Sequence, residues 1–219
     1  SPIKNIADFK DNLYSRIEID PQNLSDEIWV FNNSNDLNIL NKMKETSISL
    51  DDYTKNGIFR GITTGLNEAF IINEEIKNKI IAEDPKSSEL IKPYVTGTEI
   101  EKFNLNIRNK YYLLHIKWEF NPKEYPGIFK YLEKHKELFK KRKSTIYKDK
   151  PDYSIFGVGD YSFSSYKIGI AGFYNSTHFT LIEPNDSKPI MLDDTCYFIG
   201  FEKLKMAEIA HYLLNSEIV

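Results

Sequence analysis

The chain has 219 residues, of which 41% are hydrophobic and 28% charged, and its formal net charge is −3. This length allows one sizeable domain or a domain with an appended segment, whereas a mean hydropathy of −0.47 without an apolar run near ~18 residues argues against a membrane-spanning helix. The single Cys196 excludes a disulfide framework and a cysteine-based zinc site, and the whole pattern is typical of a cytoplasmic protein without a membrane partner.

The first 56 residues are predicted to be mainly helical. Apolar side chains recur at helical spacing from Ile3 to Ile17, a short strand or buried turn is expected over 28–31, and a second helix over 36–44. Residues 47–56 have the composition of a connector. Because Asn56-Gly57 is a turn signal, we expect the main domain boundary there, between a connector (1–56) and a domain (57–219).

Residues 57–219 combine short apolar runs with amphipathic stretches. Helices are predicted after the capping residue Asn73, from Pro126 to Arg142, and over 203–214. Strands are predicted over 69–72, 111–116, 167–173, 178–182, 189–192 and 195–201. Since strands and helices do not alternate as regular βαβ units, the pattern predicts an α+β fold of mixed short strands with flanking helices.

The charge is unevenly distributed along the chain. Residues 123–150 carry 10 basic and 4 acidic side chains, whereas residues 1–56 and 151–219 are acidic. A basic run of this kind is most often the solvated face of a helix. The alternative is a ridge that contacts phosphate groups.

Motifs for catalysis are largely absent from the sequence. The pairing Asn121-Pro122 is followed by Lys-Glu, so the Asn-Pro-Pro-aromatic motif of amino-methyltransferases is missing, and residues 155–159 match only the tail of a glycine-rich cofactor loop. Glu75-x-Lys77, with Asp51 or Asp52 upstream, is a weak match to a magnesium nuclease. We therefore expect no catalytic residues, no metal site and no cofactor in this chain, and a buried structural role for Cys196.

An ordered set of motifs in 57–219 resembles a known family. Residues 57–70, Gly-Ile-Phe-Arg-Gly-Ile-Thr-Thr-Gly-Leu-Asn-Glu-Ala-Phe, resemble the opening of TaqI-like specificity domains, and residues 91–100, Ile-Lys-Pro-Tyr-Val-Thr-Gly-Thr-Glu-Ile, resemble their next block. The later matches are Tyr125 to Ile128 with Tyr131, Leu132 and Arg142, then 156–163 with 166–168, then 193–198, and 213–216. Each motif alone is weak, but the ordered set is specific.

This resemblance implies a function for the whole chain. TaqI-like domains are the C-terminal target-recognition modules of adenine-specific DNA methyltransferases and type IIG restriction–modification enzymes, which act in phage defence. The resemblance implies that this chain binds double-stranded DNA and that residues 1–56 are a connector or the tail of a catalytic domain. It also implies that a methyltransferase domain of the same polypeptide, outside this chain, uses S-adenosylmethionine, with Mg²⁺ if a nuclease is present.

Two sets of residues are predicted to contact DNA. A glycine-rich turn places Arg60, Thr63, Thr64 and Asn67 where they could read base edges, although the glycines could equally shape a hairpin that the polar residues cap. The phosphate contacts expected from the basic run are Lys140, Lys141, Arg142, Lys143, Ser144, Tyr147, Lys148 and Lys150, with Lys92 and Lys167 as second-rank sites. The alternatives are a catalytically competent DNA-modifying enzyme and a protein-interaction module of a phage-defence complex.

Overall fold

The computed structural model describes residues 34–54, 57–101, 103–108, 110–116, 120–148, 150–172 and 178–216. Its contacts divide the chain into two compact units, Ser1–Tyr53 and Thr54–Val219. The helix predicted over 3–17 and the strand or turn predicted over 28–31 lie outside the described residues. The boundary predicted between residues 56 and 57 stays a prediction.

The described N-terminal residues are helical. The helix predicted over 36–44 is confirmed as α2 (Ser34–Thr46). The expected connector also contains a short helix, α3 (Leu50–Thr54), which was not predicted. Its start is stabilised by Ser49, whose Oγ accepts a hydrogen bond from the backbone N–H of Asp52 at 3.0 Å, so a Ser-x-x-Asp cap was the overlooked signal.

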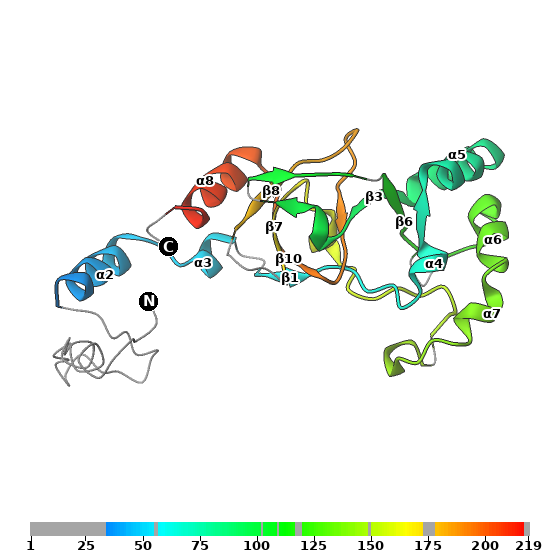
Figure 1. Ribbon diagram of the computed structural model, residues 1–219, viewed down its shortest axis with the longest axis horizontal. Coiled ribbons are helices and arrows are strands. Elements are labelled where there is room, and N and C mark those ends of the chain that lie inside the picture. Colours follow the sequence, from blue (N-terminus) through cyan, green and yellow to red (C-terminus); the bar gives the residue numbers. More distant parts are fainter. Residues whose placement is uncertain are drawn as a thin grey trace, which may run out of the picture. The chain divides into compact units, whose positions relative to one another are not determined.

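The unit from Thr54 onwards contains two four-stranded sheets (Figure 1). The first sheet has the order β1 (Phe59–Arg60), β10 (Cys196–Phe201), β7 (Tyr166–Ala171) and β8 (Thr180–Ile182), with every pair antiparallel. Helix α8 (Leu204–Leu214) packs on β7, β8 and β10 through its buried small residues Ala207 and Ala210. A two-stranded hairpin, β4 (Ile100–Glu101) and β5 (Asn104–Leu105), adjoins this sheet.

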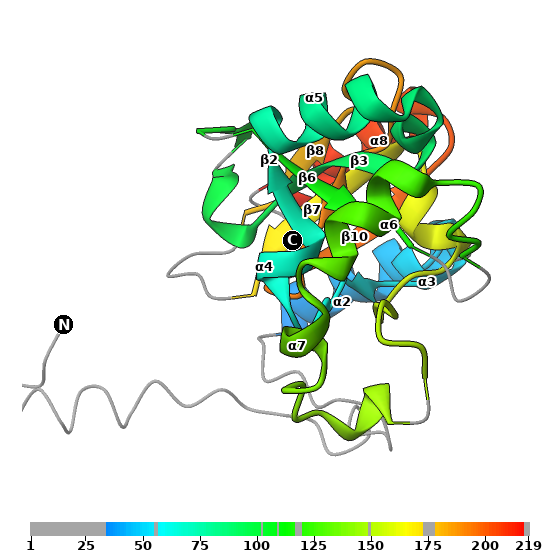
Figure 2. The ribbon, with the colours of Figure 1, turned by 90° about the vertical axis from the view of Figure 1, so that its right-hand side faces the viewer.

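The second sheet has the order β2 (Ile71–Asn73), β6 (Tyr111–Leu114), β3 (Ile91–Val95) and β9 (Met191–Leu192). Its pairs are antiparallel except for the parallel pair of β3 and β9. Helices α5 (Glu74–Glu83) and α6 (Pro126–Glu133) pack on each other, and α5 contacts β2 and β6 (Figure 2). The mixture of sheets and helices confirms the predicted α+β class, and among the described residues no helix has the length and hydropathy needed to cross a membrane.

Several predicted elements need correction at their boundaries. Ala69 and Phe70 complete a helical turn, α4 (Asn67–Phe70), so the strand predicted over 69–72 begins only at Ile71. The prediction of one helix from Pro126 to Arg142 is wrong, because α6 ends at Glu133 and a separate turn, α7 (Lys136–Phe139), follows. The break coincides with a tight bond from the N–H of His135 to the carbonyl of Leu132, three residues back, at 2.8 Å.

The other predicted elements lie close to their predicted places, whereas the strands β1, β3, β4 and β5 were not predicted. Asn73 caps α5 as expected, since its Oδ1 accepts from the N–H of Ile76 at 2.9 Å, and Asp84-Pro85 ends that helix before the 3₁₀ helix η2 (Pro85–Leu90). The apolar face predicted for the α6–α7 region is also confirmed, because Ile128, Leu132 and Phe139 are buried. Further 3₁₀ turns are η3 (Gly97–Glu99), η4 (Thr145–Tyr147) and η5 (Asp160–Phe163).

Candidate nucleic-acid interface

Residues 60–67, which we call the crossing segment, carry the chain from the first sheet to the second. Backbone N–H groups of the segment bond on both sides: Gly61 to the carbonyl of Cys196 at 3.0 Å, Ile62 to that of Leu192 at 2.8 Å, and Thr63 to that of Phe156 at 2.9 Å. Because β1 and β2 belong to different sheets, the hairpin alternative for this glycine-rich stretch is wrong. The segment instead connects the two sheets and is held by the strands β10 and β9 and by the loop that contains Phe156.

Two glycines of the crossing segment allow close approaches that a side chain would block. A Cβ on Gly61 would lie 1.9 Å from the carbonyl oxygen of Asp193. Gly65 has a positive φ of 64°, and a Cβ there would lie 2.4 Å from the ring of Tyr147. The two positions therefore require glycine for steric reasons, and Gly65 also for its backbone conformation.

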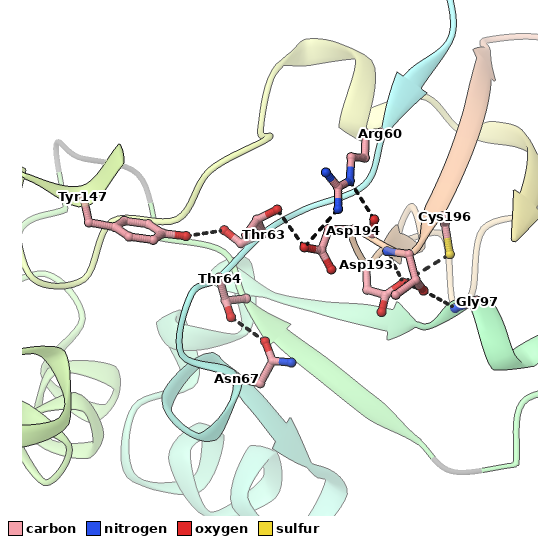
Figure 3. Close-up of polar contacts among 10 residues, drawn as sticks. Arg60, Thr63, Thr64, Asn67, Gly97, Tyr147, Asp193, Asp194 and Cys196 are labelled. Atoms are coloured by element: carbon pink, nitrogen blue, oxygen red, sulfur yellow. Dashed lines mark hydrogen bonds and ion pairs between the residues drawn. The ribbon is translucent and has the colours of Figure 1, made fainter. Parts of the chain in front are cut away.

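The side chains of Arg60 and Thr63 converge on one residue, Asp194 (Figure 3). The Nε of Arg60 donates to the carbonyl oxygen of Asp194 at 2.7 Å, and its Nη2 lies 3.6 Å from Oδ2 of the same residue. The hydroxyl of Thr63 donates to that Oδ2 at 3.1 Å. Asp194 was not among the predicted site residues, although it belongs to the family-like motif at 193–198.

Thr64 and Asn67 form a local hydrogen-bonded turn where the chain enters α4. The hydroxyl of Thr64 donates to Oδ1 of Asn67 and accepts from the N–H of Leu66 at 3.1 Å. Thr64 is buried, whereas Asn67 is exposed. Of these two predicted base readers, only Asn67 is therefore presented to solvent.

Arg142 and Tyr147 hold the crossing segment from the opposite side. The Nη1 and Nη2 atoms of Arg142 donate to the carbonyl oxygens of Ser154 at 2.7 Å and Thr64 at 2.8 Å, and its guanidinium lies 4.2 Å from the centre of the Tyr147 ring. The Tyr147 hydroxyl donates to the carbonyl oxygen of Thr63 at 2.9 Å (Figure 3). Burial lowers the pKa of Arg142 and raises that of Tyr147, yet the guanidinium stays charged at neutral pH.

These contacts indicate a structural role for Arg142, which was predicted to contact a phosphate group. Its guanidinium also lies over the rings of Phe70 at 5.0 Å and Phe139 at 5.4 Å, so it stands at the junction of α4, α7 and the crossing segment. Through its bonds to the carbonyl oxygens of Thr64 and Ser154, this side chain holds the backbone of two loops in place. A phosphate contact by Arg142 stays a prediction, and it would have to be made beside these internal bonds.

The basic segment, residues 140–150, surrounds a hollow of about 270 Å³. The positively charged side chains that line it are Arg142, Lys143, Lys148 and Lys150, together with one carboxylate, Asp152. Lys141 is exposed nearby, whereas Lys140 forms an ion pair of 2.9 Å with Glu137. The Oγ of Ser144 accepts from the N–H of Ile146 at 3.4 Å and so caps η4.

The second-rank lysines differ from the basic segment in their burial. Lys167 is only 1% exposed, and its Nζ donates to the carbonyl oxygen of Ser164 at 2.8 Å. Burial lowers the pKa of Lys167 to about 8. Lys92 is half-buried, and burial, together with the nearby charge of Lys188, lowers its pKa. In this conformation Lys167 is inaccessible to a phosphate.

The structure also places the residues weighed for metal or thiol chemistry. Among the described residues, no group of three or more His, Cys, Asp or Glu side chains could hold a metal ion. Cys196 is fully buried, as expected, and its thiol donates to Oδ1 of Asp193 at 3.2 Å. Burial and the Asp193 carboxylate raise the pKa of this thiol, which makes it a poor nucleophile.

The loop at 155–159 supplies backbone bends, as expected. Gly157 has a positive φ of 77°, and a Cβ on it would lie 3.0 Å from the carbonyl oxygen of Gly61. The neighbouring residue Phe156 pairs with Thr63 in an antiparallel bridge. This loop is therefore part of the support of the crossing segment.

Comparisons with known proteins relate the chain to restriction–modification enzymes. No family model matches it. Over 131 residues, 58% of the chain, it is 40% identical to the type II methyltransferase M.NspV of Nostoc sp. (strain ATCC 29411 / PCC 7524), and the match spans 27% of that methyltransferase. The region of similarity thus spans about a quarter of the length of that methyltransferase.

A solved structure has a similar fold. The type IIL restriction-modification enzyme MmeI, in complex with DNA, matches with a TM-score of 0.55 and 14% sequence identity, over 73% of this chain and 20% of that chain. At 14% sequence identity, this similarity shows that the two proteins share a fold. The chain therefore shares its α+β architecture with one segment of a much longer restriction–modification enzyme.

Proposed function

We propose that this chain is a TaqI-like target-recognition module that binds double-stranded DNA sequence-specifically. It serves an adenine-specific methyltransferase domain of the same polypeptide, which uses S-adenosylmethionine and, where a nuclease is present, Mg²⁺. The chain itself supplies recognition and no catalytic group. The similarity to a type II methyltransferase and the fold shared with a restriction–modification enzyme solved with DNA both support this proposal.

The observation that carries the proposal is the direct contact between the crossing segment and the basic segment. Two regions that were singled out separately in the sequence meet through Tyr147 and Thr63 and through Arg142 and Thr64. Phosphate contacts fix the register of a protein on a duplex, and polar side chains then read base edges. A polar segment joined rigidly to a lysine-rich one provides both elements of such an interface.

The charge and the exposure of each side chain suggest which residues attract DNA and which ones discriminate between sequences. Lys141, Lys143 and Lys148 are exposed and supply attraction that is equal for all sequences. Arg60 and Asn67 are exposed polar side chains of the crossing segment and supply discrimination. Arginine suits guanine, and asparagine suits adenine, in the major groove.

Fluorescence anisotropy of the full chain with a labelled random-sequence duplex, at several salt concentrations, tests the proposal. We expect dissociation constants in the range of about 10⁻⁴ to 10⁻⁶ M that weaken steeply as salt rises. Selection from a duplex pool with a randomised core should then enrich one sequence. Absence of DNA binding at low salt contradicts the proposal and favours a protein-interaction module.

A parallel assay addresses the catalytic alternative. Isothermal titration with S-adenosylmethionine, and a methyl-transfer assay on DNA, should both give no signal with this chain. A stoichiometric micromolar cofactor site, or methylated adenine in the product DNA, overturns the statement that the chain supplies recognition alone.

A further inference from the structure

Asp194 connects two side chains of the crossing segment, the exposed Arg60 and the half-buried Thr63. Its backbone carbonyl accepts from Arg60 Nε at 2.7 Å, and its Oδ2 both accepts from the Thr63 hydroxyl at 3.1 Å and lies 3.6 Å from Arg60 Nη2. Figure 3 shows both side chains directed at this one residue. Asp194 therefore restrains Arg60 and Thr63, two of the side chains predicted from the sequence to read base edges.

The turn that carries Asp194 is itself firmly held. Oδ1 of the preceding residue, Asp193, accepts from the backbone N–H of Thr195 at 3.2 Å and from the thiol of Cys196 at 3.2 Å. The hydroxyl of Thr195 in turn accepts from the N–H of Gly97 at 3.0 Å. Since this turn also bonds to Gly61 through the carbonyl of Cys196, Asp194 and the crossing segment form one framework.

The charge of Asp194 is unexpected at a surface that meets phosphate groups. Its side chain is 37% exposed, and a carboxylate near a duplex weakens the binding of every sequence by repulsion. A positioning role accounts for this residue. A guanidinium has five N–H donors, so the contacts to Asp194 fix the plane of Arg60 and leave its other donors for a base.

We propose that Asp194 is a positioning residue for sequence discrimination, which orients the Arg60 guanidinium and the Thr63 hydroxyl toward base edges. This inference rests on the proposed function. Restraint before binding lowers the entropy cost of forming a bidentate contact, and such a contact discriminates against the wrong base by about 1–3 kcal/mol. Asp194 thus acts on specificity while it weakens general affinity.

The test compares variants of the full chain on a duplex pool with a randomised core at low salt. Preference is measured as the enrichment of the selected sequence, and general affinity as anisotropy with a random duplex. The variants are D194A, D194N, the double variant R60A/T63A and the triple variant R60A/T63A/D194A. E137Q is the matched control, since it removes one exposed carboxylate beside Lys140. Thermal melting followed by circular dichroism selects the variants that are folded.

D194A removes both Oδ2 contacts but keeps the backbone carbonyl that accepts from Arg60 Nε. We expect it to bind random duplex about two- to threefold more tightly and to lose roughly 5- to 150-fold of its preference. D194N, which keeps an acceptor for Thr63, should gain the same affinity and lose less preference. The triple variant R60A/T63A/D194A should show the same preference as R60A/T63A. E137Q should tighten binding to all sequences without changing preference. A merely structural role for Asp194 predicts instead that affinity and preference fall together.

Four results overturn the inference. If D194A retains its preference, Asp194 has no positioning role. The same follows if D194A causes as large a loss of preference in the R60A/T63A background as in the unaltered chain, because Asp194 then acts independently of both side chains. Unchanged preference in R60A/T63A itself also removes it, while recognition of DNA by the chain stands. If the unaltered chain binds DNA but enriches no sequence, the proposed function and this inference both fall.

Discussion

Arg142 and Thr64 are 78 residues apart in the sequence, yet Nη2 of Arg142 donates to the carbonyl oxygen of Thr64 at 2.8 Å. The same guanidinium bonds to the carbonyl of Ser154, so one side chain fixes two loops. A buried carbonyl that loses its donor costs free energy unless water replaces it. Arg142 therefore couples the stability of this region to the geometry of the crossing segment.

Replacing Arg142 tests this coupling. We expect R142A to lower the free energy of unfolding by about 2–4 kcal/mol, because two carbonyl groups lose a charged donor and the ring contacts are lost. R142K keeps the charge but not the planar fork, so it should cost about 1–3 kcal/mol. Urea unfolding measures both values.

Lys141 provides the control for Arg142 in the same segment. It is exposed, and K141A should change the free energy of unfolding by less than about 0.5 kcal/mol. Equal effects of R142A and K141A would show that the guanidinium does not brace the crossing segment.

A second prediction concerns the close approach at Gly61. A Cβ there would lie 1.9 Å from the carbonyl oxygen of Asp193, and backbone on both sides must move to accommodate it. We expect G61A to cost about 3 kcal/mol or more. Gly57 is the matched control, since it has a φ of 75° and, apart from its chain neighbours, no atom of the described residues lies within 4 Å of its Cβ position. G57A should cost only about 1 kcal/mol for the left-handed backbone, and unfolding curves that place the two variants together contradict the steric argument.

The sequence predicted the elements of the fold better than their connections. Local signals such as the Asn73 cap and the Asp84-Pro85 stop are contained in a few adjacent residues, and they were confirmed. The break between α6 and α7 was missed because the apolar spacing continues through it to Phe139, which is buried as the unbroken pattern requires. A bend that keeps the same face buried leaves the hydrophobic period intact.

The site shows the same limit. Several polar residues of the crossing segment and several lysines of the basic segment are exposed, and their contact with DNA stays a prediction. The contact between the two segments through Tyr147 and Thr63 depends on the pairing of distant loops. Lys167 was interpreted as a possible phosphate contact or as an interface or snorkelling residue. In the structure three successive residues of β7, from Lys167 to Gly169, are buried, so both faces of the strand are covered and the Lys167 ammonium donates to the carbonyl oxygen of Ser164. Burial of this kind is a tertiary property that composition does not reveal.

A third prediction uses the buried Lys167. Its pKa is lowered from the ordinary value of 10.5 to about 8 by burial, so between these two pH values the unfolded chain binds more protons than the folded chain. The free energy of unfolding should therefore rise with pH across this window. We expect the contribution of Lys167 to increase by about 2 kcal/mol from pH 7 to pH 9.5.

The variant K167M isolates this contribution from other titrating groups. Methionine keeps the length of the side chain and removes the charge, so the unaltered chain should gain about 2 kcal/mol of stability relative to K167M as the pH rises from 7 to 9.5. Urea unfolding at several pH values measures it. A difference that is constant from pH 7 to pH 9.5 means that Lys167 has an ordinary pKa.

The last prediction separates the basic segment from a merely solvated helix face. Lys140 is paired with Glu137, so the exposed lysines Lys141, Lys143 and Lys148 are the better phosphate contacts. Each neutralised phosphate adds about 0.9 to the slope of log affinity against log salt on duplex DNA. K141A/K143A/K148A should therefore weaken binding to all duplexes alike and flatten the slope by up to about 2.7. The control K86A/K130A/K136A removes three lysines that each lie near a carboxylate, and it should leave the slope nearly unchanged. If the two triple variants behave alike, the attraction comes from total charge, and the basic segment is a solvated face.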